Sequence, residues 1–324
     1  MKLVSRSCGN GVALAANISL PIAIQRAGPN AQRRFVEFFA AHIRNKGTRM
    51  AYADAVRRFF DWCEEFGIEI SSVSPIIIAT YIEQLMASYS VPTVKLHLAA
   101  IRSLFDFLVT GQVVPSNPAA AVRGPKHVVH KGKTPVLSAS ETRKLLDGID
   151  TRKIKGQRDK ALIGLLVFSF ARVSAAINMN IGDLFWQNRR LWFRLHEKGS
   201  KYHEVPAHHH AETYLHDYLD TAGIRDQAKG PLFRTISPRK RLSLRRMDRV
   251  DVYRMIQRRA QAVGIETRVC CHTFRATGIT AYLENGGLLE HAQKIACHSS
   301  VRSTKLYDRT SDAITLDEIE KIRI

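Results

Sequence analysis

The sequence predicts a mainly α-helical protein of two domains, the second of which also contains a small antiparallel β-sheet. Apolar residues recur every three or four positions along most of the chain, which is the spacing of one face of an amphipathic helix. With 324 residues the chain is longer than one compact domain usually is, and its 45% hydrophobic residues suffice for two cores. A basic segment rich in proline and glycine, residues 117–136, is interpreted as the linker between them.

Residues 29–116 are predicted to form a bundle of four helices with short connections. The helical patterns lie at 31–45, 51–67, 74–88 and 93–111. Gly67 is placed to end the second helix, while Ser74 and Pro75 are typical of the cap and first turn of the third. In the fourth helix the apolar residues face inward, which leaves Lys95 and Arg102 facing outward.

Residues 1–28 are interpreted as a flexible tail. Lys2 and Arg6 before a modestly apolar run are typical of an export signal, but Asn17, Ser19 and Pro21 interrupt that run. The chain has five cysteines, an odd number without Cys-x-x-Cys spacing. We therefore expect free thiols in a reducing cytoplasm, and not a disulfide framework.

Residues 137–310 are predicted to form the second, mostly helical domain. Ser138 and Glu141 match a capping box, and the apolar run from Asp159 predicts a buried helix that ends at Arg172. Two strand-like runs on either side of 198–200 predict a β-hairpin. The remaining residues, 311–324, have a small apolar stripe and are interpreted as a C-terminal tail or helix.

The charge of the chain indicates a polyanionic partner. Its net charge is +20, and nucleic acid is the polyanion that such a surface most often attracts. A membrane is the competitor, but no apolar run approaches eighteen residues. Nine Lys/Arg and only two Asp lie between Arg239 and Arg259, which favours contact with the DNA backbone over a merely solvated face. The predicted DNA contacts are Lys95, Arg102, Arg123, Lys126, Lys201, Arg239, Arg241 and Arg245.

Six polar residues of the second domain stand in an order that is more informative than any one of them. An Arg follows a nearly uncharged helix, a Lys lies at a hairpin tip, and a His-x-x-Arg pair shares one helix face. A second His comes 23 residues after that Arg, and a Tyr follows it nine residues later. Alone, each fits an ordinary surface or packing role. The set comprises Arg172, Lys198, His272, Arg275, His298 and Tyr307.

Together and in this order, these residues resemble the tyrosine recombinase (phage integrase) family, and its bacterial Xer-like members in particular. The resemblance covers nearly the whole chain. It implies that residues 29–116 form a SAM-like core-binding domain and that 137–310 form the catalytic domain. The two would close as a C-shaped clamp on duplex DNA, and residues 311–324 would dock into a neighbouring protomer.

The chemistry of phosphodiester cleavage explains why these residue types are needed. Attack on phosphorus builds negative charge on the non-bridging oxygens, which the forked guanidiniums of Arg172 and Arg275 can clamp. A tyrosine phenol has a pKa near 10, so a nucleophilic tyrosine needs a proton acceptor, for which His272 is the candidate base or relay. His298 would donate a hydrogen bond to the phosphate.

The resemblance assigns Tyr307 as the nucleophile and the hairpin lysine as the acid for the departing 5′-oxygen. Lys198 is preferred for that acid, and Lys201 is the second candidate. The product would be a 3′-phosphotyrosine, whose bond energy is retained, so no ATP, metal or other cofactor is expected. Three residues depart from the family pattern. Ala175 stands where a Glu is usual, Cys297 where a Gly is usual, and Phe274 where a Leu is usual.

Other interpretations were weighed. The cysteine and histidine pairs at 270–272 and 297–298 are adjacent in sequence, which suits zinc chelation poorly, and the histidines at 208–210 fit an exposed turn. The family implies strand exchange between two specific DNA sites by a homotetramer, through a Holliday junction. A partner recombinase or accessory factor stays open. The rival functions are DNA relaxation like that of a type IB topoisomerase, and DNA binding without catalysis.

Overall fold

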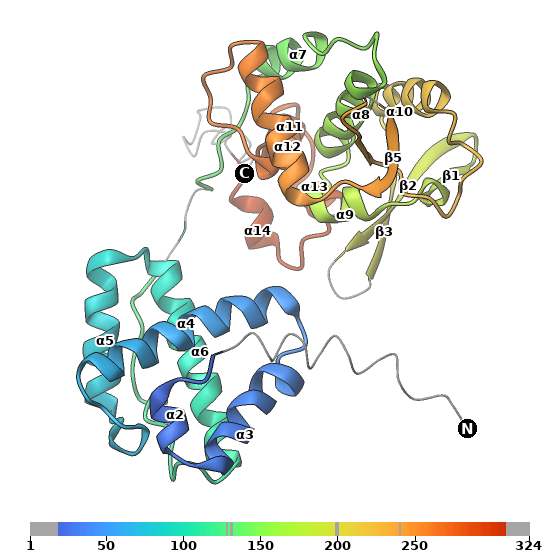
Figure 1. Cartoon of the computed structure of the whole chain (residues 1–324). Coiled ribbons are helices and arrows are strands. Elements are labelled where there is room, and N and C mark those ends of the chain that lie inside the picture. The colour runs from blue at the N-terminus through green and yellow to red at the C-terminus, as the bar shows by residue number, and fades with distance from the viewer. Residues whose placement is uncertain (1–18, 128, 130–131, 198–200, 240, 309–324) are drawn as a thin grey trace, which may run out of the picture. The chain divides into compact units, whose positions relative to one another are not determined.

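The computed structural model of the chain describes residues 19–127, 129, 132–197, 201–239 and 241–308. The chain divides into two compact units, Met1–Val128 and Val129–Ile324, which are coloured from blue to green and from green to red in Figure 1. Each unit has its own hydrophobic core. None of the described helices is both long and apolar enough to cross a membrane.

The first unit is a helical bundle around an aromatic core. Phenylalanines from three of the helices fill this core, among them Phe35, Phe59 and Phe105, which are fully buried. The predicted starts and stops of helices are confirmed, because Ser74 caps a helix that has Pro75 in its first turn, and Gly67 has the positive φ of 63° expected after a helix end. The helices are α2 (Ile22–Arg26), α3 (Pro29–Glu37), α4 (Lys46–Glu65), α5 (Pro75–Ser88) and α6 (Val91–Thr110), with a π-helical turn at Phe38–His42 and a 3-10 turn at Ile70–Ser72.

The first unit is larger than the sequence predicted. The interpretation of residues 1–28 as a flexible tail is wrong for α2, since Ile24 is fully buried in the bundle core. The linker prediction is wrong at its start, because Ala119 and Val122 belong to the same core. Arg102 does not face outward: its Nε donates to the Ala119 carbonyl at 2.9 Å and its Nη2 to the Val122 carbonyl. These bonds hold the segment that leaves the bundle against α6.

The second unit combines helices with two small antiparallel sheets. The predicted hairpin is confirmed, with Glu197 opposite Lys201 at its last paired position, and the capping box of Ser138 and Glu141 is present. The helices are α7 (Ala139–Asp147), α8 (Ile154–Phe168), α9 (Val173–Asn178), α10 (His209–Ala222), α11 (Arg249–Ala262), α12 (Cys271–Glu284), α13 (Leu289–Ile295) and α14 (Val301–Lys305), with a 3-10 turn at Ile181–Asp183. The strands are β1 (Leu184–Gln187), β2 (Arg190–Glu197) and β3 (Lys201–Pro206) in one sheet, and β4 (Arg234–Ile236) and β5 (Leu242–Arg246) in the other.

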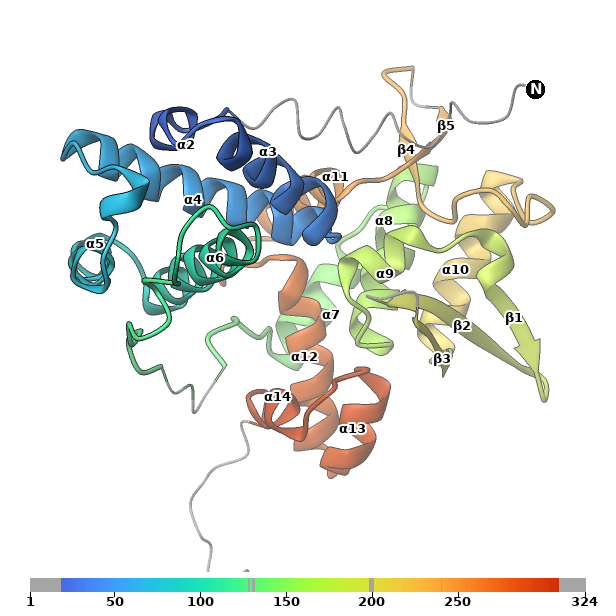
Figure 2. The ribbon, with the colours of Figure 1, turned by 90° about the horizontal axis from the view of Figure 1, so that it is seen from below.

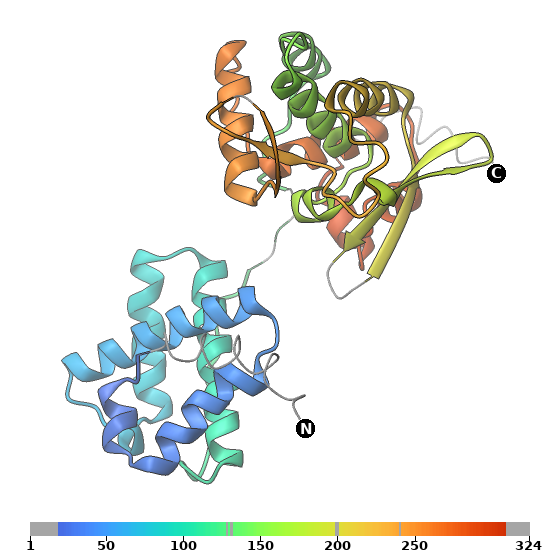
Figure 3. The same cartoon turned by 45° about the vertical axis from the view of Figure 1, so that its right-hand side comes forward.

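Helix α8 is the centre of this unit and packs against α10 and α12. It is buried on all sides from Ala161 to Val167, as expected for an interior helix whose second half is apolar throughout. It ends at Phe168, so the prediction that it ends at Arg172 is wrong: Arg172 instead caps the start of α9. The sheet β1–β2–β3 lies at the edge of the unit (Figure 3), and α12, α13 and α14 lie next to one another (Figure 2).

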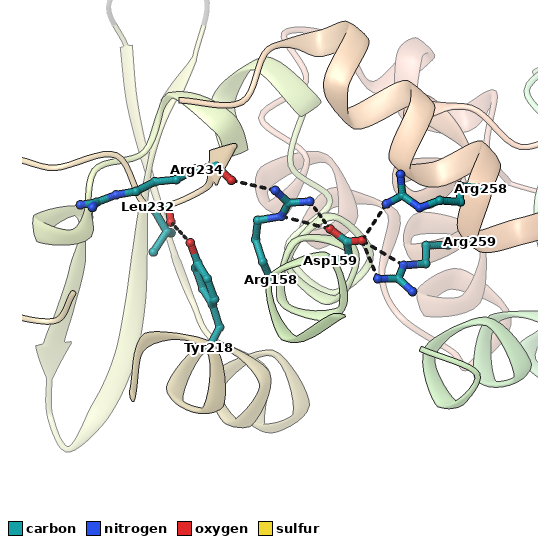
Figure 4. Close-up of polar contacts among 7 residues, drawn as sticks. All are labelled: Arg158, Asp159, Tyr218, Leu232, Arg234, Arg258 and Arg259. Atoms are coloured by element: carbon teal, nitrogen blue, oxygen red, sulfur yellow. Dashed lines mark hydrogen bonds and ion pairs between the residues drawn. The ribbon is translucent and has the colours of Figure 1, made fainter. Parts of the chain in front are cut away.

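A buried carboxylate ties α8 to α11 (Figure 4). Asp159 is completely buried and accepts hydrogen bonds from its neighbour Arg158 and from Arg258 and Arg259 of α11. Arg158 also donates to the carbonyl of Arg234 at 2.8 Å, which connects the cluster to β4. Two arginines of the basic run at 239–259 therefore have an internal partner.

Candidate active site

Four short segments of the second unit carry five of the six predicted catalytic residues. Arg172 caps the start of α9, and His272 and Arg275 lie in the first two turns of α12. His298 follows α13, and Tyr307 follows α14. Helix α12 packs against both α8 and α13. The fold therefore brings together residues that are more than 100 positions apart in the chain.

Arg275 holds these segments together. Its side chain is almost fully buried, and it donates through Nη1 to the carbonyl of Phe170 and through Nη2 to the carbonyl of Ala296 at 2.5 Å. Those carbonyls lie two residues before Arg172 and two residues before His298. Burial first, and then the charge of Arg172, lowers the pKa of Arg275 to about 10, which still leaves the guanidinium charged at pH 7. The charge of Arg172 is therefore felt at Arg275.

His272 is kept in its neutral form in this site. Burial is the largest cause that lowers its pKa below the usual value, and the positive charges of Arg275, Arg249 and Arg172 add to it. A neutral imidazole can accept a proton at pH 7. Sequence reasoning did not single out Arg249, although it is the first residue of α11 and lies within the electrostatic reach of His272.

His298 is also neutral, and its orientation is set by a buried threonine. Burial, followed by Arg275 and Arg172, lowers its pKa to about 4. Its Nδ1 lies 2.9 Å from the hydroxyl oxygen of Thr304, which is fully buried. If the hydroxyl donates to Nδ1, the imidazole carries its proton on Nε2 and can donate it to a ligand. The backbone of Cys297, at the position where a glycine was expected, has a φ of 48°.

Tyr307 is anchored through its backbone and half-buried through its ring. Its ring lies nearly parallel to that of His298, at 9° with 5.8 Å between the centroids. The Thr280 hydroxyl on α12 donates to the Tyr307 carbonyl at 3.0 Å. The preceding carbonyl, that of Leu306, accepts from the backbone N–H of Gly132 at 2.9 Å, so the start of the second unit contacts the segment that bears Tyr307.

One functional candidate was missed in the sequence. Glu197, the last residue of β2, lies 2.5 Å from Nη1 of Arg172 through its Oε2. The charges near Glu197 in the sequence did not indicate this partner, because Arg172 is 25 residues away in the chain and on another element. Lys198, predicted as the acid, lies outside the described residues. Lys201 begins β3, and its side chain is likewise outside them.

The predicted DNA contacts are mostly exposed. Lys95 lies on the surface of α6, and Arg123 and Lys126 lie on the segment that follows the first bundle. Arg239 and Arg241 are exposed beside β5, whereas Arg102 is turned inward as described above. Arg245 is exposed too, although it pairs with Asp251 at 3.4 Å and lines a basic cavity of about 930 Å³ with Lys153, Lys155, Arg254 and Arg258.

Within the part of the chain that the structure describes, no group of three or more His, Cys, Asp or Glu side chains could hold a metal ion.

Comparisons with known proteins were made with both sequence and structure. A model of the "Phage integrase family" matches residues 135–313, and one of the "Phage integrase, N-terminal SAM-like domain" matches residues 34–112. Among curated proteins, a tyrosine recombinase XerC of Chlamydia muridarum is 31% identical over 233 residues, covering 71% of this chain and 70% of that protein. A XerC of Thermodesulfovibrio yellowstonii is 29% identical over 280 residues, covering 84% and 90%.

Solved structures share the fold. The XerH site-specific recombinase in a post-cleavage complex with a palindromic difH substrate has a TM-score of 0.70 at 17% identity, covering 99% of this chain and 91% of that one. A λ integrase tetramer bound to a Holliday junction has a TM-score of 0.64 at 16% identity, covering 96% and 90%. These comparisons confirm the predicted mainly helical fold with a SAM-like N-terminal domain.

Proposed function

This chain belongs to the phage integrase family, and on that basis we propose that it is a site-specific DNA recombinase that cuts and rejoins DNA through Tyr307. One observation supports the proposal above all others. The charges of Arg172 and Arg275 act on two neutral histidines, His272 and His298. The ring of the half-buried Tyr307 lies against that of His298, in a chain whose net charge is +20. That is the set of groups that attack on a phosphodiester requires.

The proposed reaction is a transesterification. The Tyr307 oxygen attacks the scissile phosphorus while His272 accepts the phenol proton, directly or through a relay. Arg172 and Arg275 bind the non-bridging oxygens, and His298 donates its Nε2 proton to the same phosphate. A new O–P bond forms to Tyr307 as the bond to the 5′-oxygen breaks, and that oxygen takes its proton from Lys198. Reversal by a 5′-hydroxyl reseals the strand.

The assembly is proposed on the same basis. Two DNA sites held by four protomers would exchange strands in pairs through a Holliday junction, as a λ integrase tetramer bound to such a junction suggests by its similar fold. Both units would contact the DNA backbone, through Lys95, Arg123 and Lys126 in the first unit and through Arg239, Arg241 and Arg245 in the second. We expect the reaction to take place in the cytoplasm.

Covalent trapping tests this function. The protein is incubated in EDTA with labelled DNA from around its own gene, nicked so that the cleaved fragment diffuses away, and run on a denaturing gel. A covalent adduct is expected for the wild type. Tyr307→Phe should form none while it binds the same DNA as tightly, because only the phenol oxygen is removed.

Tyr282→Phe is the matched control, since Tyr282 lies on α12 and packs against the same apolar cluster as Tyr307. It should still form the adduct. An adduct in Tyr307→Phe would contradict the assignment of the nucleophile, and specific binding without any adduct would favour an accessory DNA-binding protein. Relaxation of supercoiled DNA by the monomer, without exchange between two sites, would favour a topoisomerase.

A further inference from the structure

Glu197 occupies a position where an acidic residue is unexpected on physical grounds. Side chains alternate along β2, and those on its inner face (Leu191, Phe193 and Leu195) are buried in the core of the second unit. Glu197 continues that row and is 8% exposed. A carboxylate at the end of an apolar row loses its hydration, which stabilises the fold only if a partner restores the lost interactions.

The partner is a residue of the active site. Oε2 of Glu197 lies 2.5 Å from Nη1 of Arg172, whose side chain is 35% exposed while that of Glu197 is 5% exposed. The guanidinium is planar, so a hydrogen bond at one nitrogen restricts the orientation of the whole group. Within the described residues, Arg172 makes no other side-chain hydrogen bond, so its Nε and Nη2 donors are free for a ligand.

The ion pair reduces the electrostatic repulsion between two arginines of the site. Arg172 is close enough to Arg275 to lower the pKa of Arg275, whereas the charge of Glu197 acts in the opposite direction. Without an anion between them, the two guanidiniums repel each other. Glu197 therefore offsets this repulsion before DNA arrives and reduces the reorganisation that binding would otherwise require.

No nearer carboxylate does this. Ala175, at the third position of α9 where related sequences were expected to carry Glu, is buried and has no polar group. Among the described residues, Glu197 is the one acidic side chain that forms an ion pair with Arg172. It reaches Arg172 from the sheet, at the end of β2.

We propose that Glu197 positions Arg172 for the scissile phosphate and so replaces, from another element, the carboxylate that Ala175 lacks. This inference rests on the proposed function. Glu197 is a positioning residue, because it contacts Arg172 and not the reacting atoms.

The test is the single-turnover rate of adduct formation on the nicked DNA, measured together with DNA binding and the melting temperature. Glu197→Gln keeps the shape and removes the charge. It should slow adduct formation by roughly 10- to 100-fold, the range found when a residue that orients a metal ligand is lost, while DNA binding changes little. Glu204→Gln is the matched control on the same hairpin, since Glu204 pairs with the exposed Arg194. It should react at the wild-type rate.

Two further variants separate a positioning role from a structural one. Ala175→Glu combined with Glu197→Gln should recover part of the lost rate. The Arg172→Lys variant has already lost the forked guanidinium. In that background, Glu197→Gln should slow adduct formation much less than it does in the wild type. A general loss of folding would slow both backgrounds equally, and that result would overturn the proposal.

The remaining outcomes are distinct. If the wild type forms the adduct and Glu197→Gln is equally fast, Glu197 has no role in positioning while the proposed function stands. If the wild type forms no adduct on DNA that it binds specifically, the proposed function fails, and the inference on Glu197 fails with it.

Discussion

At the scale of single residues, the site is organised around groups that are kept in one protonation state. Burial disfavours the charged forms of His272 and His298, because an added proton would be poorly hydrated, and the positive charges of Arg275 and Arg172 repel it further. His272 and His298 are therefore neutral by position. With the Thr304 hydroxyl as the donor to Nδ1, a neutral His298 carries its proton on Nε2, and we expect it to donate to the phosphate through that atom.

The low pKa of His298 makes the stability of the protein depend on pH. The pKa falls from 6.5 to about 4 in the folded protein, so between these values the unfolded chain binds more protons. The free energy of unfolding should consequently decrease as the pH falls from about 6.5 to about 4. We expect His298→Gln to melt with a weaker pH dependence in this window.

The measurement is the melting temperature of both proteins from pH 7 to pH 4, in the absence of DNA. His291→Gln, which changes an exposed histidine of α13, is the control and should follow the wild type. Identical pH profiles for the wild type and His298→Gln would contradict the assignment.

At the scale of secondary-structure elements, buried hydrogen bonds from arginine side chains connect helices with the loop segments that lie against them. Arg275 connects α12 with the segments before α9 and after α13, and Arg102 holds the end of the first bundle. There is no room for a side chain at position 132, because a Cβ added to Gly132 would lie 2.6 Å from the carbonyl oxygen of Leu306. The segment bearing Tyr307 is thus packed against the start of the second unit.

Asp159 is the contact with the largest expected effect on stability. It accepts hydrogen bonds from Arg158, Arg258 and Arg259 and has no exposed surface (Figure 4). Asp159→Asn would leave arginines without their counter-charge, and breaking a buried pair in this way costs about 3–5 kcal/mol. Chemical denaturation should show that loss.

Asp150→Asn is the comparison, since Asp150 pairs with Arg152 at the surface. It should leave the denaturation midpoint unchanged. A loss for Asp159→Asn no larger than that of Asp150→Asn would mean that α8 and α11 are joined by apolar packing alone.

At the scale of the whole molecule, the charge of the chain matters more for binding than for folding. With a net charge of +20, DNA binding should release counterions, and the logarithm of the binding constant should fall by about 0.9 per phosphate contacted for each log unit of salt. Arg241→Ala, at an exposed position beside β5, should weaken binding to all DNA sequences and reduce this slope by about 1.

Titration of binding against salt concentration measures both slopes. Arg143→Ala on the exposed face of α7 is the control for loss of one charge and should leave the slope unchanged. An equal decrease for both variants would mean that net charge matters and that β5 contributes no specific contact.

The sequence by itself determined what depends on short spacings. Apolar residues at helical intervals predicted the first bundle, Ser74 and Gly67 marked where helices begin and end, and the order from Arg172 to Tyr307 indicated the family. Such signals can be read locally because capping and amphipathicity involve residues within a few positions of one another.

Only the tertiary structure decided which distant charges meet. Nothing near Glu197 in the chain indicates Arg172 as its partner, and Asp159 lies 100 residues from Arg259. Arg102 has the spacing of a surface residue, yet it turns inward because the chain after α6 folds back and offers it two carbonyls. A buried ion pair depends on packing that brings its partners together, and that packing is a property of the whole fold.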